Sequence, residues 1–209
     1  MEEKITIPNG RYQLEGCWQE GTVQKGVVIT HPHPLYGGTM YNPVVETLQN
    51  IYRRHGYTTL RFNFRGVGGS SGNHDKGIGE QDDVRVAIAY VESKNVGPVD
   101  LAGYSFGAWV NSGVAAGGNP PIESMVMISP PVGFIEFENI SALRCLKLVV
   151  TGSRDDIAPA GQILELLPTW NPDAQFELID GCDHFYSGHL DRLQAILTHY
   201  LQSAKSEPA

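Results

Sequence analysis

The chain lacks a long hydrophobic run and a recognisable secretory leader. No window of its 209 residues approaches the roughly eighteen consecutive apolar residues that a membrane-spanning helix needs. The opening residues, MEEKITI, have no basic segment followed by an apolar one. We therefore expect no membrane span, no signal peptide and a location in the cytoplasm.

Basic residues and cysteines are also few. Fifteen Lys and Arg are outnumbered by 23 Asp and Glu, which gives a net charge of −8 and leaves no cluster of cations to neutralise phosphates. Nucleic acid and anionic membranes are therefore not expected as partners. The three cysteines, Cys17, Cys145 and Cys182, show no CxxC spacing, which excludes a disulfide framework and a zinc knuckle.

No cofactor or metal is predicted. The Gly-rich stretch from Arg65 to Gly72 follows an apolar run, but it lacks the GKS/T end of a phosphate loop and a clean GxGxxG. His31 and His33 are separated by one proline and have no third ligand nearby in the sequence. We expect these two histidines to brace the loop in which they lie.

The first residues predict an antiparallel hairpin, and the rest predicts alternating strands and helices. Ile5 to Ile7 is followed by an Asn9-Gly10 turn and an alternating second strand. Short β-branched runs then follow, which is typical of strands buried on both faces. These runs are Val27 to Thr30, Thr58 to Phe64, Val99 to Ala102, Met125 to Ser129, Leu146 to Thr151 and Phe176 to Ile179.

Helical spacing fills the segments between these runs. Asn42 is suited to cap a helix from Pro43 to His55, because Asn favours the N-cap and Pro the first helical position. Further apolar repeats are Val84, Ile88 and Val91, and Leu190, Leu193, Leu197 and Leu201. The order predicts a mostly parallel sheet covered on both faces, in one domain over residues 1–209 with a frayed tail at 204–209.

The pentapeptide GYSFG, residues 103–107, lies between an apolar run and a helix-compatible segment from Ala108 to Ala116. A serine on a sharp strand-to-helix turn presents its hydroxyl, and flanking glycines let the backbones pass closely. Ser105 is therefore a candidate nucleophile that needs a base. Cys182, two residues before His184, is a weaker candidate, because a nucleophile needs a positioned base and Ser105 already lies in a more suitable sequence context.

The base and the acid should follow later strands, because a parallel sheet presents its chemistry beyond the carboxyl ends of its strands. His184 lies in the loop GCDHF after the last predicted strand, and Asp155 lies in GSRDDIAP after the strand that begins at Leu146. The adjacent Asp156 stays open as the acid. The order Ser105, Asp155, His184 is that of a nucleophile-elbow triad. Alternatively, Ser105 only makes a tight turn, Asp155 caps a helix and His184 is a hydrogen-bonded loop residue.

With these motifs in register, the chain resembles the α/β-hydrolase superfamily over nearly its whole length. Four motifs are similar to those of the superfamily: the elbow GYSFG, the acid turn GSRDDIAP, the histidine loop GCDHF and the turn RFNFRGVGGSSG. A fifth, HPHPLYGGTM, is similar to the oxyanion segment found in small prokaryotic hydrolases related to dienelactone hydrolases. The resemblance implies an α/β-hydrolase fold with about eight strands and no cap domain, since only about fifteen residues, 130–145, separate two strands where relatives carry a lid.

The resemblance also implies a reaction. Ser105, His184 and Asp155 would form an acyl-enzyme, and the backbone N–H groups of Leu35 and Phe106 would hold the oxyanion. Aromatic residues that would line the pocket are Tyr36, Tyr104, Phe134, Phe137 and Tyr186. We expect a hydrolase of small-molecule esters or thioesters of small to medium acyl groups.

Other functions stay open at this stage. Within the hydrolases, a thioesterase and a dienelactone-type lactone hydrolase are alternatives, although dienelactone hydrolases carry cysteine where this chain has Ser105. A non-catalytic binding protein and a metal-free haloperoxidase-like activity are possible on the same fold. The oligomeric state is left open.

Overall fold

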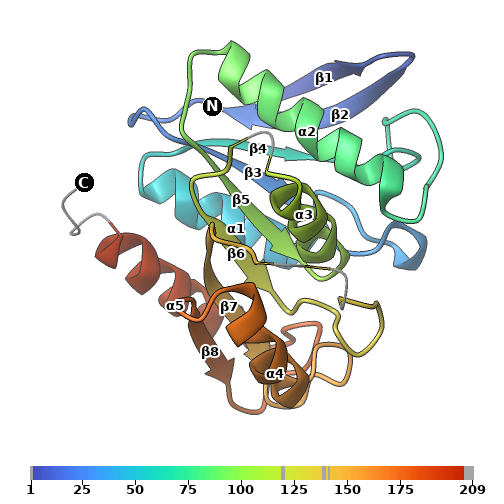
Figure 1. Ribbon diagram of the computed structural model, residues 1–209. Helices are drawn as coiled ribbons and strands as arrows, with labels where there is room; N and C mark the ends of the chain where they lie inside the picture. The colour runs from blue at the N-terminus through green and yellow to red at the C-terminus, as the bar shows by residue number, and fades with distance from the viewer. Residues whose placement is uncertain (1, 119–120, 138–139, 141, 205–209) are drawn as a thin grey trace.

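The computed structural model describes residues 2–118, 121–137, 140 and 142–204, which form an eight-stranded sheet between layers of helices (Figure 1). The expected frayed tail lies outside the described residues except for Ala204. The strands are β1 (Glu3–Asn9), β2 (Tyr12–Gln19), β3 (Gly26–Thr30), β4 (Thr58–Phe62), β5 (Val99–Tyr104), β6 (Met125–Ile128), β7 (Leu146–Gly152) and β8 (Gln175–Ile179). The helices are α1 (Pro43–Arg54), α2 (Ile78–Ser93), α3 (Phe106–Ala116), α4 (Ala160–Trp170) and α5 (Leu190–Ser203), with a short 3-10 turn, η1 (Pro34–Tyr36).

The sheet is mixed, as the sequence predicts. Its order is β1-β2-β4-β3-β5-β6-β7-β8. The pairs β1–β2 and β2–β4 are antiparallel, and all the remaining neighbouring strands pair parallel. Parallel pairing from β4 to β8 follows from the strand-helix-strand order, because each helix returns the chain to the same end of the sheet. The carboxyl ends of these strands therefore share one edge.

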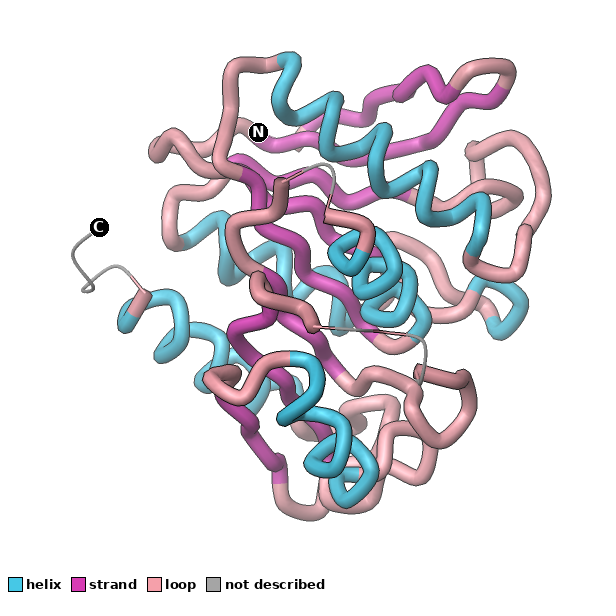
Figure 2. Tube along the Cα trace, viewed as in Figure 1, coloured by secondary structure: helices cyan, strands magenta, loops and turns pink. Residues whose placement is uncertain are grey.

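Helices cover both faces and create two cores. On one face, buried residues of α2, α3 and α4 pack against the sheet around Val84, Val110 and Ile163. On the other face, α1 and α5 pack together, with Leu48 and Leu197 in the core. Figure 2 shows the same layers, with α2, α3 and α4 in front of the strands and α1 and α5 behind them. Strands that are buried on both faces explain the continuous apolar runs in the sequence.

Several boundaries differ by one or two residues from the sequence-based expectation, and one helix was not expected. The strand expected from Thr58 to Phe64 ends at Phe62. The Asn63 N–H still donates to the Glu15 carbonyl of β2, but the Glu15 N–H donates to Ser70 Oγ and the Phe64 N–H donates to the His31 ring, so the ladder with β2 stops there. The helix α4 begins after Pro159 and was not expected from the sequence. The Asn42 cap and Pro43 at the first position of α1 are confirmed.

The connection between β6 and β7 spans only residues 129–145, so the fold has no cap domain there. In the part of the chain that the structure describes, no helix is long and apolar enough to cross a membrane.

Candidate functional site

Ser105 lies on a sharp turn between β5 and α3. Its backbone has φ 54° and ψ −120°, a conformation that non-glycine residues rarely adopt. The turn needs glycine on both sides, since a Cβ on Gly103 would lie 2.6 Å from the Ala108 nitrogen and one on Gly107 would lie 2.5 Å from Thr30 Oγ1. The Ser105 N–H donates to the Ile128 carbonyl at 2.8 Å, which ties the turn to β6.

His184 and Asp155 meet Ser105 at the carboxyl edge of the sheet. Ser105 Oγ lies 2.9 Å from His184 Nε2, and His184 Nδ1 lies 2.9 Å from both carboxylate oxygens of Asp155. Three loops supply these side chains, one each after β5, β7 and β8, and Figure 2 shows loops gathered at that end of the strands. The protein thus brings together three residues that are far apart in the sequence.

The carboxylate of Asp155 is held by more than the histidine. It accepts the backbone N–H groups of Ile157 at 3.0 Å and Ala158 at 2.7 Å. Burial alone would raise the pKa of Asp155, but the hydrogen bond and charge of His184 and the Ala158 N–H outweigh it, and the pKa is lowered. Asp155 is therefore an anion at neutral pH, whereas the adjacent Asp156 is exposed and has no such contact with His184.

An ionised Asp155 fixes the state of the imidazole. The carboxylate accepts a hydrogen bond from the Nδ1–H group, so the neutral ring has no proton on Nε2 and can accept one from the Ser105 hydroxyl. Tyr104 adds a second restraint, because its hydroxyl donates to the His184 carbonyl at 2.7 Å. The arrangement can activate a serine hydroxyl as a nucleophile.

The loop after β3 forms one wall of the site. His31 is buried; its Nδ1 donates to the Pro32 carbonyl and its Nε2 accepts the Phe64 N–H. The ring of His33 packs on Phe106 with centroids 4.7 Å apart. Burial lowers the pKa of His33 and nearby His74 adds to this, which favours the neutral ring; its Nδ1 accepts the Leu35 N–H at 3.2 Å. Both histidines therefore brace the loop.

The two expected oxyanion donors differ in their surroundings. Phe106 is the first residue of α3, where a helix leaves its N–H groups without an intrahelical partner. The Leu35 N–H is already donated to His33, and Leu35 does not line the cavity. The His33 N–H has no hydrogen-bond partner within the described residues, and His33 lines the cavity.

A cavity of about 550 Å³ opens beside Ser105. Three of the aromatic residues expected to line it do so: Tyr36, Tyr104 and Phe134. Residues that the sequence reasoning missed are Pro32, Asn42, Pro131, Ile135, Ile157 and Phe185. Of these, only Phe185 carried a sequence signal, because it directly follows His184.

Two other expected aromatic residues lie in the core. Tyr186 is buried and its hydroxyl lies 2.8 Å from Ser129 Oγ. Phe137 is buried against Trp170, with ring centroids 5.2 Å apart. Neither residue lines the cavity.

The remaining candidate groups have other roles in the structure. Cys182 is buried, and burial raises the pKa of its thiol to about 11, so it is protonated at neutral pH. In the Gly-rich segment, Arg65 bonds the buried carboxylate of Asp83 at 2.7 Å and so ties this segment to α2. Within the described ranges of the chain, no three His, Cys, Asp or Glu side chains are grouped to hold a metal ion.

The chain is similar to known proteins over most of its length. Residues 27–198 match the model of the alpha/beta hydrolase family. An uncharacterized protein of Rickettsia prowazekii is 32% identical over 211 residues, which cover 95% of this chain and 87% of that protein.

Two solved structures share the fold throughout. An alpha-beta serine hydrolase homologue from Coxiella burnetii is 33% identical with a TM-score of 0.89, and the match covers 95% of this chain and 97% of the other. A serine hydrolase without a lid from Xanthomonas campestris is 28% identical, also with a TM-score of 0.89, over 100% and 97% of the two chains.

Proposed function

Because the chain belongs to the alpha/beta hydrolase family, we propose that it is a serine hydrolase that cleaves carboxylic esters or thioesters of small to medium acyl groups. The observation that supports this proposal is the unbroken hydrogen-bonded series from Ser105 Oγ through the His184 ring to the Asp155 carboxylate. A serine hydroxyl becomes a good nucleophile only when such a base removes its proton.

The reaction follows from the proton positions. Ser105 Oγ attacks the carbonyl carbon of the ester while its proton passes to His184 Nε2, and Asp155 stabilises the resulting imidazolium. The imidazolium then gives its proton to the departing alkoxide or thiolate as the carbon–oxygen or carbon–sulfur bond breaks. Water, deprotonated by the same nitrogen, attacks the acyl-enzyme and releases the acid and free Ser105.

The charge that develops on the carbonyl oxygen needs hydrogen-bond donors. The free N–H of Phe106 at the start of α3 suits this role, and the positive end of the helix dipole adds to it. For the second donor we propose the His33 N–H in place of the expected Leu35 N–H, since the Leu35 group is donated to His33 Nδ1. Removing one such donor typically slows turnover about 10²–10³-fold.

The absence of a cap domain favours short or flexible acyl groups. With only residues 129–145 between β6 and β7, the cavity opens directly to solvent and needs no lid movement before the substrate binds. We expect short-chain esters to be cleaved in solution without an interface. A strong preference for long-chain triglycerides would contradict this part of the proposal.

Covalent labelling tests the nucleophile. A fluorophosphonate should add to the protein once, detected by intact mass, and the adduct should be absent in Ser105→Ala. Ser93→Ala, at the exposed end of α2, is the matched control and should label like the wild type. No adduct, or an adduct retained by Ser105→Ala, would show that the chain is a binding protein on the hydrolase fold or uses another nucleophile.

Substrate panels test the bond that is cleaved. We propose p-nitrophenyl esters of graded chain length beside acyl-CoA thioesters of the same acyl groups and a simple lactone. Cleavage of esters with the highest kcat/KM at short chain lengths supports the proposal. A preference for the CoA series or for the lactone would instead favour the thioesterase or the dienelactone-type reaction.

A further inference from the structure

Three aromatic side chains at the mouth of the cavity are mostly exposed. Tyr36 is 74% exposed, Phe185 69% and Phe134 58%, whereas most large apolar side chains of the sheet and helices are buried. They come from three separate segments: η1, the β6–β7 connection and the β8–α5 connection. All three line the same cavity. Aromatic groups that meet at one exposed place mark a ligand-contact surface.

Each of these rings already lies edge-to-face with an aromatic ring of the site. Tyr36 and Phe134 lie with centroids 6.0 Å apart and planes at 67°, and Phe185 stands at 88° to the His184 ring with centroids 5.7 Å apart. Edge-to-face geometry of this kind is the preferred arrangement of aromatic pairs. The mouth therefore offers ring faces and edges that a further flat ring can join.

The cavity lining has few groups that carry a fixed charge. Among the described residues that line it, none is Asp, Glu, Lys or Arg, and the polar side chains are those of Asn42, Ser105 and Tyr104 and of the histidines His33 and His184. An ionised substrate group placed there would lose its hydration without gaining a partner. The volume of about 550 Å³ is in the range that holds a whole small organic molecule. This lining suits an uncharged occupant.

From these features we infer that the cavity binds esters that carry an uncharged aromatic ring close to the carbonyl, with the ring held between Tyr36, Phe134 and Phe185. This inference rests on the proposed serine hydrolase function and adds to it the class of substrate. The physical basis is ring geometry and not apolarity alone, because a saturated ring of the same carbon number is at least as apolar but cannot make aromatic contacts.

Matched ester pairs test the inference. One pair places the ring on the acyl side, ethyl 3-phenylpropanoate against ethyl 3-cyclohexylpropanoate. The other places it on the alcohol side, 3-phenylpropyl acetate against 3-cyclohexylpropyl acetate. We expect kcat/KM to favour the phenyl ester about tenfold in at least one pair, the effect of two aromatic contacts. The pair that shows the preference identifies which side of the ester bond lies among the rings.

Substitutions then assign the preference to the rings. Phe134→Leu and Tyr36→Leu keep an apolar side chain but remove the aromatic face, so each should bring the phenyl-to-cyclohexyl ratio of kcat/KM toward one. Tyr41→Leu is the matched control, because Tyr41 is an exposed tyrosine outside the cavity. It should keep the wild-type ratio.

Fluorophosphonate labelling separates the two ways of failing. Without labelling of Ser105, the proposed function itself is wrong. With labelling, the inference about aromatic esters is overturned by a ratio near one in both pairs, by a preference for cyclohexyl, by a preference that both leucine variants retain, or by no cleavage of any of the four esters.

Discussion

Asp100 is a buried carboxylate without an adequate partner, and its titration should be measurable in the stability of the protein. It is the second residue of β5, 3% exposed, and its Oδ1 has no hydrogen-bond partner within the described residues. Burial raises the pKa of Asp100 from 3.8 to about 6. The neighbouring groups that act on it are the hydroxyls of Ser124 and Tyr57 and the cation of Lys25, which lower the pKa, and the anion of Glu123, which raises it.

The pKa difference gives the size and sign of the effect. Below about pH 4 the carboxyl is protonated in both the folded and the unfolded chain, so it has no effect on stability. As the pH rises to about 6 the unfolded chain loses the proton while the folded protein keeps it, so the free energy of unfolding falls. Above that range the folded protein bears the whole cost, which is about 3 kcal/mol for a difference of roughly two pKa units.

His31 acts in the opposite direction over nearly the same range. Burial lowers the pKa of its ring from 6.5 to about 4. The unfolded chain therefore takes up a proton as the pH falls below about 6.5, while the folded protein resists until about 4. Stability is lost in acid by roughly 3 kcal/mol. In the wild type, the effects of Asp100 and His31 on the free energy of unfolding therefore nearly cancel between about pH 4 and pH 7.

The substitution Asp100→Asn removes one side of this balance. We propose urea unfolding of the wild type and the variant near pH 4 and near pH 7.5. The stability of the variant relative to the wild type should rise by about 3 kcal/mol between the two pH values, or roughly 6–12 °C in Tm. Any pH-independent cost of the amide cancels in this comparison. The contributions of all other titrating groups to the pH dependence, including that of His31, cancel as well because both proteins carry them.

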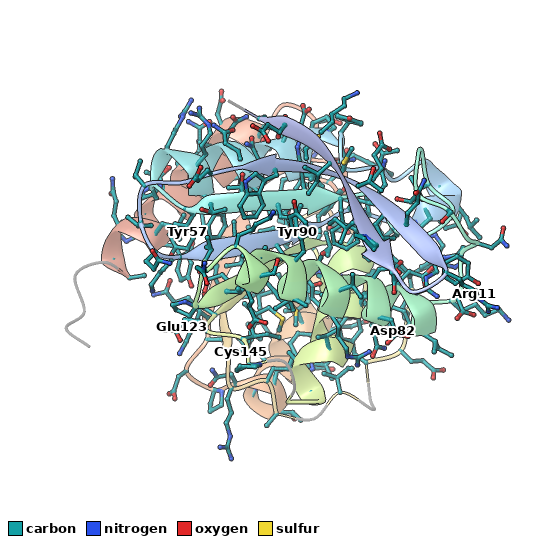
Figure 3. The ribbon with its side chains drawn as sticks, turned by 90° about the horizontal axis from the view of Figure 1, so that it is seen from above. Arg11, Tyr57, Asp82, Tyr90, Glu123 and Cys145 are labelled. Carbon is teal, nitrogen blue, oxygen red and sulfur yellow. The ribbon has the colours of Figure 1, made fainter. Side chains whose placement is uncertain are left out.

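Activity is the internal control. Asp100 is the second residue of β5 and Ser105 follows the other end of this strand, so labelling of Ser105 should be unchanged. Figure 3 shows Tyr57 and Glu123, two of the groups that act on Asp100, at the end of the molecule opposite Arg11. A relative stability that is independent of pH would refute the assignment of an uncompensated buried carboxylate to Asp100.

Three further predictions concern the site and its supports. Asp155→Asn should lower kcat for p-nitrophenyl acetate about 10³–10⁴-fold by leaving the imidazole in the wrong tautomer, whereas Asp156→Asn should keep a kcat near that of the wild type. Equal losses of kcat in the two variants would contradict the choice of Asp155 as the acid. Gly107→Ala should destabilise the protein, because its Cβ would meet Thr30 Oγ1 at 2.5 Å. Gly161→Ala, whose Cβ would meet no atom within 4 Å, should instead raise the free energy of unfolding in urea by about 0.5–1 kcal/mol. The opposite order of stabilities would be inconsistent with this packing. Cys182 should resist iodoacetamide until urea unfolds the protein, as read from labelled peptides, since burial raises its pKa to about 11; rapid labelling of the folded protein would contradict its burial.

The sheet and the turn that carries Ser105 could be predicted because their signals are local. A strand buried on both faces is a short apolar run, and the Ser105 turn needs glycines at fixed positions, so both are visible within a few residues. Asp155 and Asp156 could not be separated by the same means. Their difference lies in the turn after β7, which aims one carboxylate at His184 and the other at solvent.

The cavity wall could not be predicted because it is assembled from distant loops. Phe134 and Tyr36 meet across the mouth, whereas Tyr186, two residues after His184, turns into the core and reaches Ser129. Both kinds of tyrosine look alike in the sequence. The Leu35 N–H illustrates the same limit, since its availability depends on the rotamer and protonation of the His33 ring.

The position of Ser105 explains why the fold tolerates its unfavourable backbone. A positive φ outside glycine costs about 1–3 kcal/mol and persists only where the surroundings leave no alternative. Here β5 pairs with β3 on one side and β6 on the other, the Ser105 N–H is bonded to Ile128, and Gly107 leaves no free space against Thr30. Relaxing the serine would break contacts on both neighbouring strands. The central place of β5 in the sheet is therefore what keeps the hydroxyl beside His184, and loosening either neighbour should cost labelling of Ser105 before it costs the fold.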